Sequence, residues 1–110
     1  MPPKLTGLHW TEESELHVEE HIEPWLIDEM ILEGGDYYIF PNIEKHPMDR
    51  WKFIGRTPSG FRVTAILAEP TEENPGQWRP ITGWQSTNYE QKMYEQRRGH
   101  QSKTQGKRHG

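Results

Sequence analysis

The sequence contains no cysteine, which excludes disulfides, thiolate nucleophiles and cysteine-based zinc sites. Long apolar segments are missing as well: no run of hydrophobic residues exceeds four, whereas a helix that crosses a membrane needs roughly 20. The first residues, Met1 to Lys4, do not form the apolar stretch of a secretion signal. We therefore expect a soluble, cytoplasmic protein with no membrane partner. The 110 residues are 31% hydrophobic, which is enough for one small core.

Positive charge is scarce in most of the chain. The formal net charge is −4, but residues 97–110 carry five Lys or Arg residues and no acid, so the preceding part holds eight bases against 17 acids. Ten of these acids lie between Glu12 and Asp36. A field of that sign repels a phosphate backbone, so binding to nucleic acid would need a local basic site. The basic tail is either a solvated extension or a segment that contacts RNA or an acidic partner.

Local sequence signals predict an α+β fold. The predicted elements are helices over 12–21, from Pro24 to before Gly34, and from Asn88, a short strand over 37–40, and strands over 51–56, 61–67 and 78–84. Thr11 fits a helix N-cap, and Thr87 with Glu90 matches a capping box. Residues 57–60 form a turn-forming tetrad between two strands. Tight turns favour a small antiparallel sheet of three or four strands, with two N-terminal helices and one C-terminal helix.

The same features divide the chain into three parts. Residues 1–10 form an N-terminal segment, residues 11–96 form a single α+β domain, and residues 97–110 form a basic tail. Because the tail has no apolar residue after Arg98, it has nothing to bury and we expect it to be disordered. Residues 42–49 are expected to form a polar loop.

A histidine pattern lies on the first predicted helix. His17, Glu20 and His21 spell His-x-x-Glu-His, the inverted zinc-protease motif, in which two histidines bind metal and a carboxylate activates water. A catalytic zinc ion needs a third protein ligand, which this pattern does not supply. Three interpretations stay open: a small zinc hydrolase, a functional His21 without metal, and an ordinary solvated helix face.

Other side chains also have a structural and a functional interpretation. Arg56 can clamp a phosphate or pair with a surface acid. Glu90 belongs to the capping box and can also lie beside a site, while Tyr94 can pack in the core. Tryptophans can supply core area or, where exposed, stack on RNA bases; they are Trp10, Trp25, Trp51, Trp78 and Trp84.

Taken together, these segments resemble the BrnT family of small toxins in type II toxin-antitoxin systems, which share the RelE-like ribonuclease fold. The resemblance runs from about His9 to Glu95. It is carried, in order, by Trp10 before an acidic helix start, His17-Val18-Glu19-Glu20-His21-Ile22, Phe53-Ile54-Gly55-Arg56 with its hairpin, and Ile81-Thr82-Gly83-Trp84-Gln85-Ser86-Thr87-Asn88-Tyr89-Glu90 followed by Tyr94.

The resemblance implies RNA cleavage without a metal or another cofactor. A base removes the proton of a 2′-hydroxyl, that oxygen attacks the neighbouring phosphate, and a cation stabilises the phosphorane. The resemblance makes Arg56 the cation, His21 the base or acid, Glu90 a second base or the group that orients His21, and Tyr94 a donor to a phosphate oxygen. It also implies an RNA substrate and a small BrnA-like antitoxin as partner.

The chain departs from the family pattern at one of its cationic positions. Trp84 and Gln85 stand where the family usually has an arginine, and the closing helix carries Glu90-Gln91-Lys92 instead of an arginine-rich run. A second hypothesis is therefore a non-catalytic RelE-like domain that binds a protein. A toxin should lose at least roughly tenfold in activity on Arg56→Ala, with a stability change within about 0.5 kcal/mol if Arg56 is an exposed strand-end charge.

Overall fold

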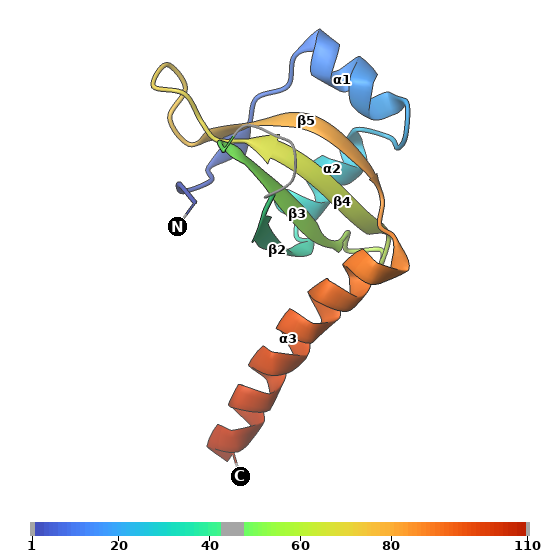
Figure 1. Cartoon of the computed structure of the whole chain (residues 1–110), viewed down its shortest axis with the longest axis vertical. Helices are drawn as coiled ribbons and strands as arrows, with labels where there is room; N and C mark the ends of the chain where they lie inside the picture. The colour runs from blue at the N-terminus through green and yellow to red at the C-terminus, as the bar shows by residue number, and fades with distance from the viewer. Residues whose placement is uncertain (1, 43–47, 110) are drawn as a thin grey trace.

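The computed structural model describes residues 2–42 and 48–109, with side chains described up to residue 99. In chain order the elements of these residues are β1 (Gly7–Leu8), α1 (Glu12–Glu19), α2 (Trp25–Ile31), β2 (Asp36–Pro41), β3 (Arg50–Arg56), β4 (Arg62–Ala68), β5 (Gln77–Gln85) and α3 (Asn88–His109). The five strands form one curled, mixed sheet in the order β1-β5-β4-β3-β2 (Figure 1). The α+β class is therefore confirmed.

The sheet is larger than the sequence predicts, with five strands rather than three or four, and it is not wholly antiparallel. The additional strand is β1, which pairs in parallel with β5 at Gln77 and Trp78. It lies in the segment 1–10, which the sequence analysis separates from the domain. A strand of two residues is too short to show an alternating pattern, so only its tertiary partner reveals it.

The central hairpin matches the prediction. β3 and β4 pair antiparallel from Arg50 opposite Ala68 to Arg56 opposite Arg62, and Gly60 turns the chain with a φ of +92°, where glycine has no steric penalty. β4 also pairs antiparallel with β5, with a register shift between Ile66 and Leu67. Pro80 lies opposite this irregularity, where a missing backbone N–H is tolerated.

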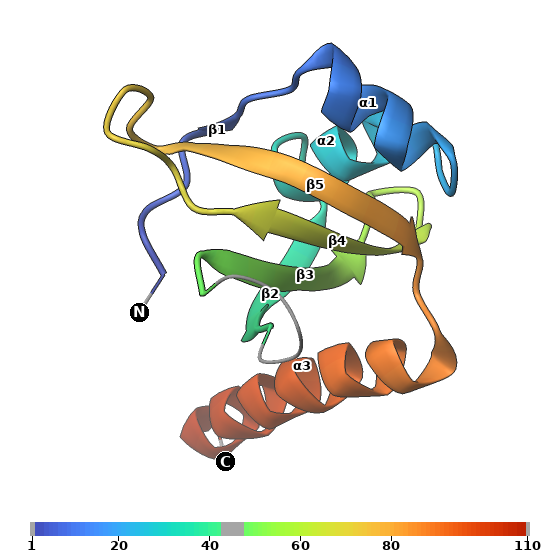
Figure 2. The same cartoon turned by 45° about the horizontal axis from the view of Figure 1, so that its top comes forward.

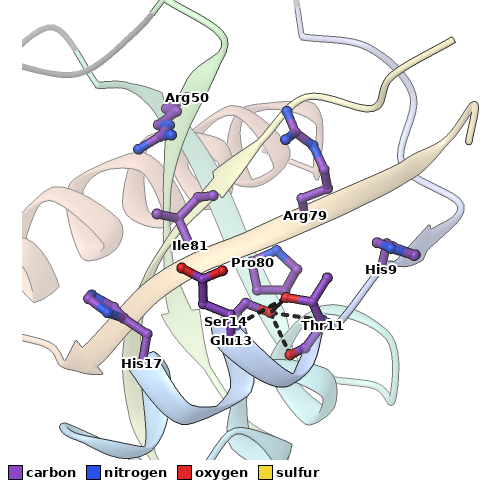
Figure 3. A pocket seen from close by; sticks show the side chains of 9 residues that line it. All are labelled: His9, Thr11, Glu13, Ser14, His17, Arg50, Arg79, Pro80 and Ile81. Atoms are coloured by element: carbon purple, nitrogen blue, oxygen red, sulfur yellow. Dashed lines mark hydrogen bonds between the residues drawn. The ribbon is translucent and has the colours of Figure 1, made fainter. Parts of the chain in front are cut away.

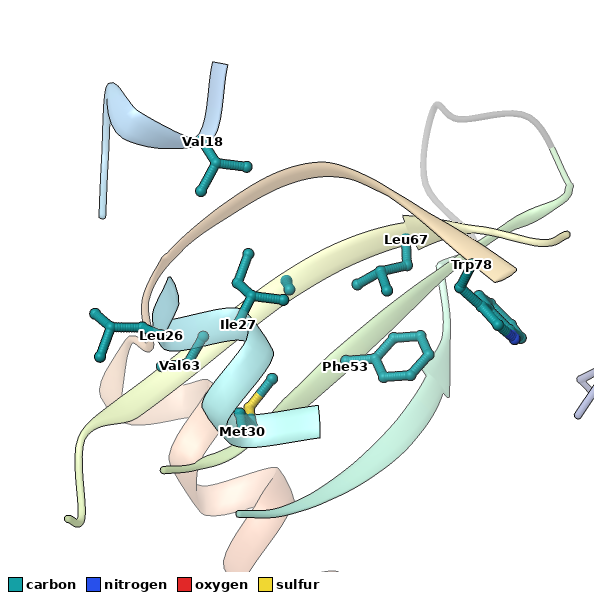
Figure 4. Packing of buried hydrophobic residues seen from close by; sticks show 9 residues of the cluster. Val18, Leu26, Ile27, Met30, Phe53, Val63, Leu67 and Trp78 are labelled. Carbon is teal, nitrogen blue, oxygen red and sulfur yellow. The ribbon is translucent and has the colours of Figure 1, made fainter. Parts of the chain in front are cut away.

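The sheet separates two layers of helices (Figure 2). Neighbouring residues of a strand point to opposite faces, and on β3 the two clusters divide accordingly. Phe53 belongs to the same core cluster as Val18 of α1 and Leu26, Ile27 and Met30 of α2 (Figure 4). Ile54 instead packs with Phe40 and with Tyr94 of α3. The two N-terminal helices thus share one face of the sheet, and α3 covers part of the other.

Helix ends follow the local signals, except at the C-terminus. The Thr11 hydroxyl accepts a hydrogen bond from the Ser14 N–H, and α1 ends at Glu19, two residues before the expected end. The chain from Arg97, expected to be disordered, instead continues α3 to His109; once a helix is nucleated, each further residue adds one backbone hydrogen bond. Within the described residues, no helix is both long enough and apolar enough to span a bilayer.

The polar loop expected over 42–49 is described only in part, because residues 43–47 lie outside the described residues.

Candidate functional site

Glu90 is buried at the start of α3, with 6% of its surface exposed. Its carboxylate accepts hydrogen bonds from the Thr87 backbone N–H at 2.8 Å, from the Thr64 hydroxyl at 3.1 Å and from the Trp84 indole at 3.0 Å. Lys52 Nζ lies 3.8 Å from the carboxylate. The predicted capping box is therefore confirmed, since the Glu90 N–H also donates to the Thr87 hydroxyl. Internal donors occupy this carboxylate.

Arg56, the last residue of β3, is held against α3. Its Nε donates to Gln91 Oε1 at 3.1 Å, and its Nη2 pairs with Glu95 Oε1 at 2.6 Å. The guanidinium carbon also lies 5.3 Å from the centre of the Tyr94 ring, within the range of a cation–π contact. Arg56 therefore joins the sheet to α3 and has less freedom to bind a phosphate than a surface arginine has.

Tyr94 occupies the buried side of the same helix. Its hydroxyl donates to Asp36 Oδ2 at 2.8 Å and accepts from Arg98 Nη1 at 3.4 Å. Burial raises the pKa of Tyr94 above its usual value of 10.0, and the hydrogen bond to the Asp36 carboxylate raises it further. The phenol is a protonated donor that links β2 to α3.

Stability at alkaline pH should reveal this link. Because the folded protein holds the Tyr94 proton more tightly than the unfolded chain, ionisation favours unfolding; stability is intact below about pH 10 and falls as pH rises further. Tyr94→Phe should lower the free energy of unfolding at pH 7 by about 1 kcal/mol through the lost hydrogen bond, but should lose less of it than the wild type as pH rises above about 10. Thermal melts across this range test the expectation. The exposed Tyr89 provides a control, and a Tyr94→Phe profile parallel to that of Tyr89→Phe would contradict it.

The structure brings three of the four predicted catalytic residues together and leaves the fourth apart. Arg56, Glu90 and Tyr94 all lie at the contact between α3 and the sheet. His21 is exposed and follows α1, which packs on the opposite face (Figure 2). In this arrangement His21 cannot share a phosphate with Arg56. In the described part of the chain, no group of three His, Asp or Glu residues is placed to hold a metal ion.

The tryptophans divide between core and surface. Trp78 is fully buried, whereas Trp25 is 53% exposed. Trp84 stands where the resembling family has an arginine, and its indole donates to both Glu90 oxygens, at 3.0 and 3.2 Å. This tryptophan therefore stabilises the helix cap rather than binding a phosphate.

A pocket of about 360 Å³ beside β5 brings two arginines and two histidines together with one carboxylate, that of Glu13 (Figure 3). Arg50 and Arg79 line it from the sheet, and His9 and His17 lie at its opposite ends. Arg79 is held by Asp49 Oδ2 at 3.2 Å, whereas the buried Nε of Arg50 has no hydrogen-bond partner in the part of the chain that the structure describes. No sequence signal links these residues, because they come from separate elements and meet only where α1 crosses β5.

The contacts of Arg56, Glu90 and Tyr94 hold α3 against the sheet. The arginines of the pocket beside β5 can attract an anion. Comparison of the chain with protein-family models, with curated proteins and with solved structures finds no match. The family resemblance therefore stays a prediction from the sequence motifs.

Proposed function

We propose that this chain is a BrnT-like domain with a RelE-like fold that acts by binding a protein partner rather than by catalysis. One observation carries the proposal. The polar groups of Arg56, Glu90 and Tyr94 are engaged with residues of the chain itself, in bonds that attach α3 to the sheet. A general base must be able to reach the proton it abstracts, and the Glu90 carboxylate is both buried and occupied by donors.

A ribonuclease toxin with a small antitoxin partner is the second candidate, and the pocket of Figure 3 favours it. There the candidate cation is Arg50 rather than Arg56, because among the described residues no ion pair holds Arg50, whereas Glu95 pairs with Arg56. An arginine outside an ion pair suits a phosphate, which it can bind through two parallel hydrogen bonds. In this candidate the RNA phosphate lies on Arg50, and His17 is the nearer choice of base because it lines the same pocket.

An RNA-cleavage assay with a melting curve separates the two candidates. For a binding domain, we expect no cleavage of a single-stranded RNA by the wild type, while Arg56→Ala lowers the melting temperature by about 4 °C, roughly 1 kcal/mol, because the contacts to Gln91, Glu95 and Tyr94 are lost. This differs from the sequence-based expectation of an almost unchanged melt.

Cleavage by the wild type would contradict the binding proposal. Arg50→Ala then identifies the site: a loss of at least roughly tenfold would place the phosphate on Arg50, with Arg62→Ala, an exposed arginine of β4, as the matched control. A similar loss in Arg56→Ala, with an unchanged melting temperature, would instead restore the role that the family resemblance implies.

A further inference from the structure

A groove separates α1 from α2 on the face opposite α3. It has a volume of about 300 Å³ and is lined by Trp10, Glu15, Glu19, Pro24, Trp25 and Asp28. We call it the α1–α2 groove. It combines two aromatic rings with three carboxylates, and none of the described residues that line it is basic.

A hydrogen bond holds Trp10 and Asp28 in the α1–α2 groove, whereas the ring of Trp25 is open to solvent. Trp10 Nε1 donates to Asp28 Oδ1 at 2.8 Å, which holds the indole and the carboxylate in place. Trp25 makes no such contact among the described residues, and 53% of its surface is exposed. Among aromatic rings the indole attracts a lysine or arginine cation most strongly, and the exposed part of Trp25 is accessible to one.

The carboxylates of the groove are not neutralised. Glu15 and Glu19 are exposed and lie four residues apart on α1, so they project from the same side of the helix. The sequence holds no Lys or Arg from residue 5 to 44. Among the residues that the structure describes, the ion pairs join β3 or β5 to α3 or to Asp49, and none involves α1 or α2.

We propose that the α1–α2 groove binds a lysine- or arginine-rich segment of a partner protein, an inference that rests on the proposed binding function. The cation lies over the Trp25 ring, its aliphatic stem packs against Pro24, and its charge faces Glu15 and Glu19. Charge complementarity selects this occupant, since the same carboxylates repel RNA. The chain's own basic tail is not the occupant within one molecule, because α3 leads away from α1 toward the far end of the structure (Figure 1).

The test measures binding of a fluorescein-labelled peptide of alternating arginine and alanine to the full-length protein by fluorescence anisotropy. A peptide of alternating glutamate and alanine is the negative probe. We expect the basic peptide alone to bind, with an affinity that falls as salt is added because these charges are exposed to solvent. Trp25→Ala should weaken binding by roughly tenfold, while Trp25→Phe, which keeps an aromatic face, should retain part of the affinity.

Two further variants separate the groove from general acidity. Combined Glu15→Gln and Glu19→Gln changes should weaken binding by at least about threefold and flatten its salt dependence. Glu33→Gln removes one exposed charge outside the groove and should bind as the wild type does. Melting curves identify any variant that fails to fold. If Trp25→Ala does not fold, the double variant with Glu15→Gln and Glu19→Gln decides the test.

Several outcomes would overturn the proposal. Equal binding by the wild type and a folded Trp25→Ala protein would show that the groove is not the site. If Glu33→Gln weakened binding as much as the Glu15 and Glu19 changes do, the interaction would depend on net charge alone. Salt-sensitive self-association that Trp25→Ala abolishes would make a second copy the occupant. RNA cleavage with normal peptide binding would overturn only the proposed function, whereas absent peptide binding without RNA cleavage would overturn only the groove.

Discussion

Replacing Glu90 with alanine is expected to lower the free energy of unfolding by roughly 2–3 kcal/mol, or the melting temperature by about 10 °C. The change removes the acceptor of the Thr87 N–H and leaves the half-buried Trp84 indole without a partner. A lost cap and an unsatisfied donor each cost on the order of 1 kcal/mol or more. Thermal or denaturant unfolding of the purified variant measures the loss.

Two matched variants make this result specific. Glu90→Gln keeps an oxygen acceptor and a residue type that suits a capping box, so it should recover much of the stability. Glu95→Ala removes a carboxylate that is exposed and pairs with Arg56, and should cost less than about 1 kcal/mol. A Glu90→Ala protein as stable as the wild type, yet deficient in RNA cleavage, would give Glu90 the catalytic role that the structure does not favour.

Gly55→Ala is expected to destabilise the protein by at least about 3 kcal/mol, because nothing near this position can move aside. Gly55 lies opposite Tyr37 in the β2–β3 pairing, and a Cβ there would come within 2.7 Å of the Tyr37 Cα atom. The obstacle is backbone rather than a flexible side chain, so the two strands would have to separate. The separation would also displace Arg56 from its contacts on α3.

The control for Gly55→Ala is Gly99→Ala on α3. Apart from the neighbouring backbone of α3, no atom of the described residues lies within 4 Å of the position that its Cβ would take, and alanine stabilises a helix by up to about 1 kcal/mol relative to glycine. We expect this variant to melt at or above the wild-type temperature. Folding of Gly55→Ala with a melting temperature within a few degrees of the wild type would show that β2 is not held against β3 as closely as the structure describes.

Some features of the protein were predictable from short segments of sequence. The Thr11 cap, the turn before β4 and the Thr87–Glu90 box are each formed by residues within four positions of one another. The strand over Trp78 to Trp84 was also predicted to within a residue at either end. Such signals depend on local backbone geometry and side-chain hydrogen bonds, which operate in any fold that contains the segment.

The candidate site could be predicted only in part, and its actual contacts could not. Arg56, Glu90 and Tyr94 were selected individually, but their partners lie far away in sequence. Arg56 bonds to Glu95 across 39 positions, Thr64 to Glu90 across 26 and Tyr94 to Asp36 across 58. These distances in sequence explain why an apparent surface cation became an attachment point for a helix, and why His21 was grouped with residues from the other face.

By itself the sequence determined the α+β class, the helix caps, the central hairpin and the acidic character of α1 and α2, since each follows from composition or from neighbours along the chain. Only the tertiary structure decided that Gly7 and Leu8 join β5, that Trp78 is buried while Trp25 is exposed, and that Arg50 and His17 line the same pocket. The physical reason is that burial and polar contact are set by which surfaces pack together. In this protein the sheet assigns α1 and α2 to one face and α3 to the other, and that division depends on pairings between strands remote in the chain.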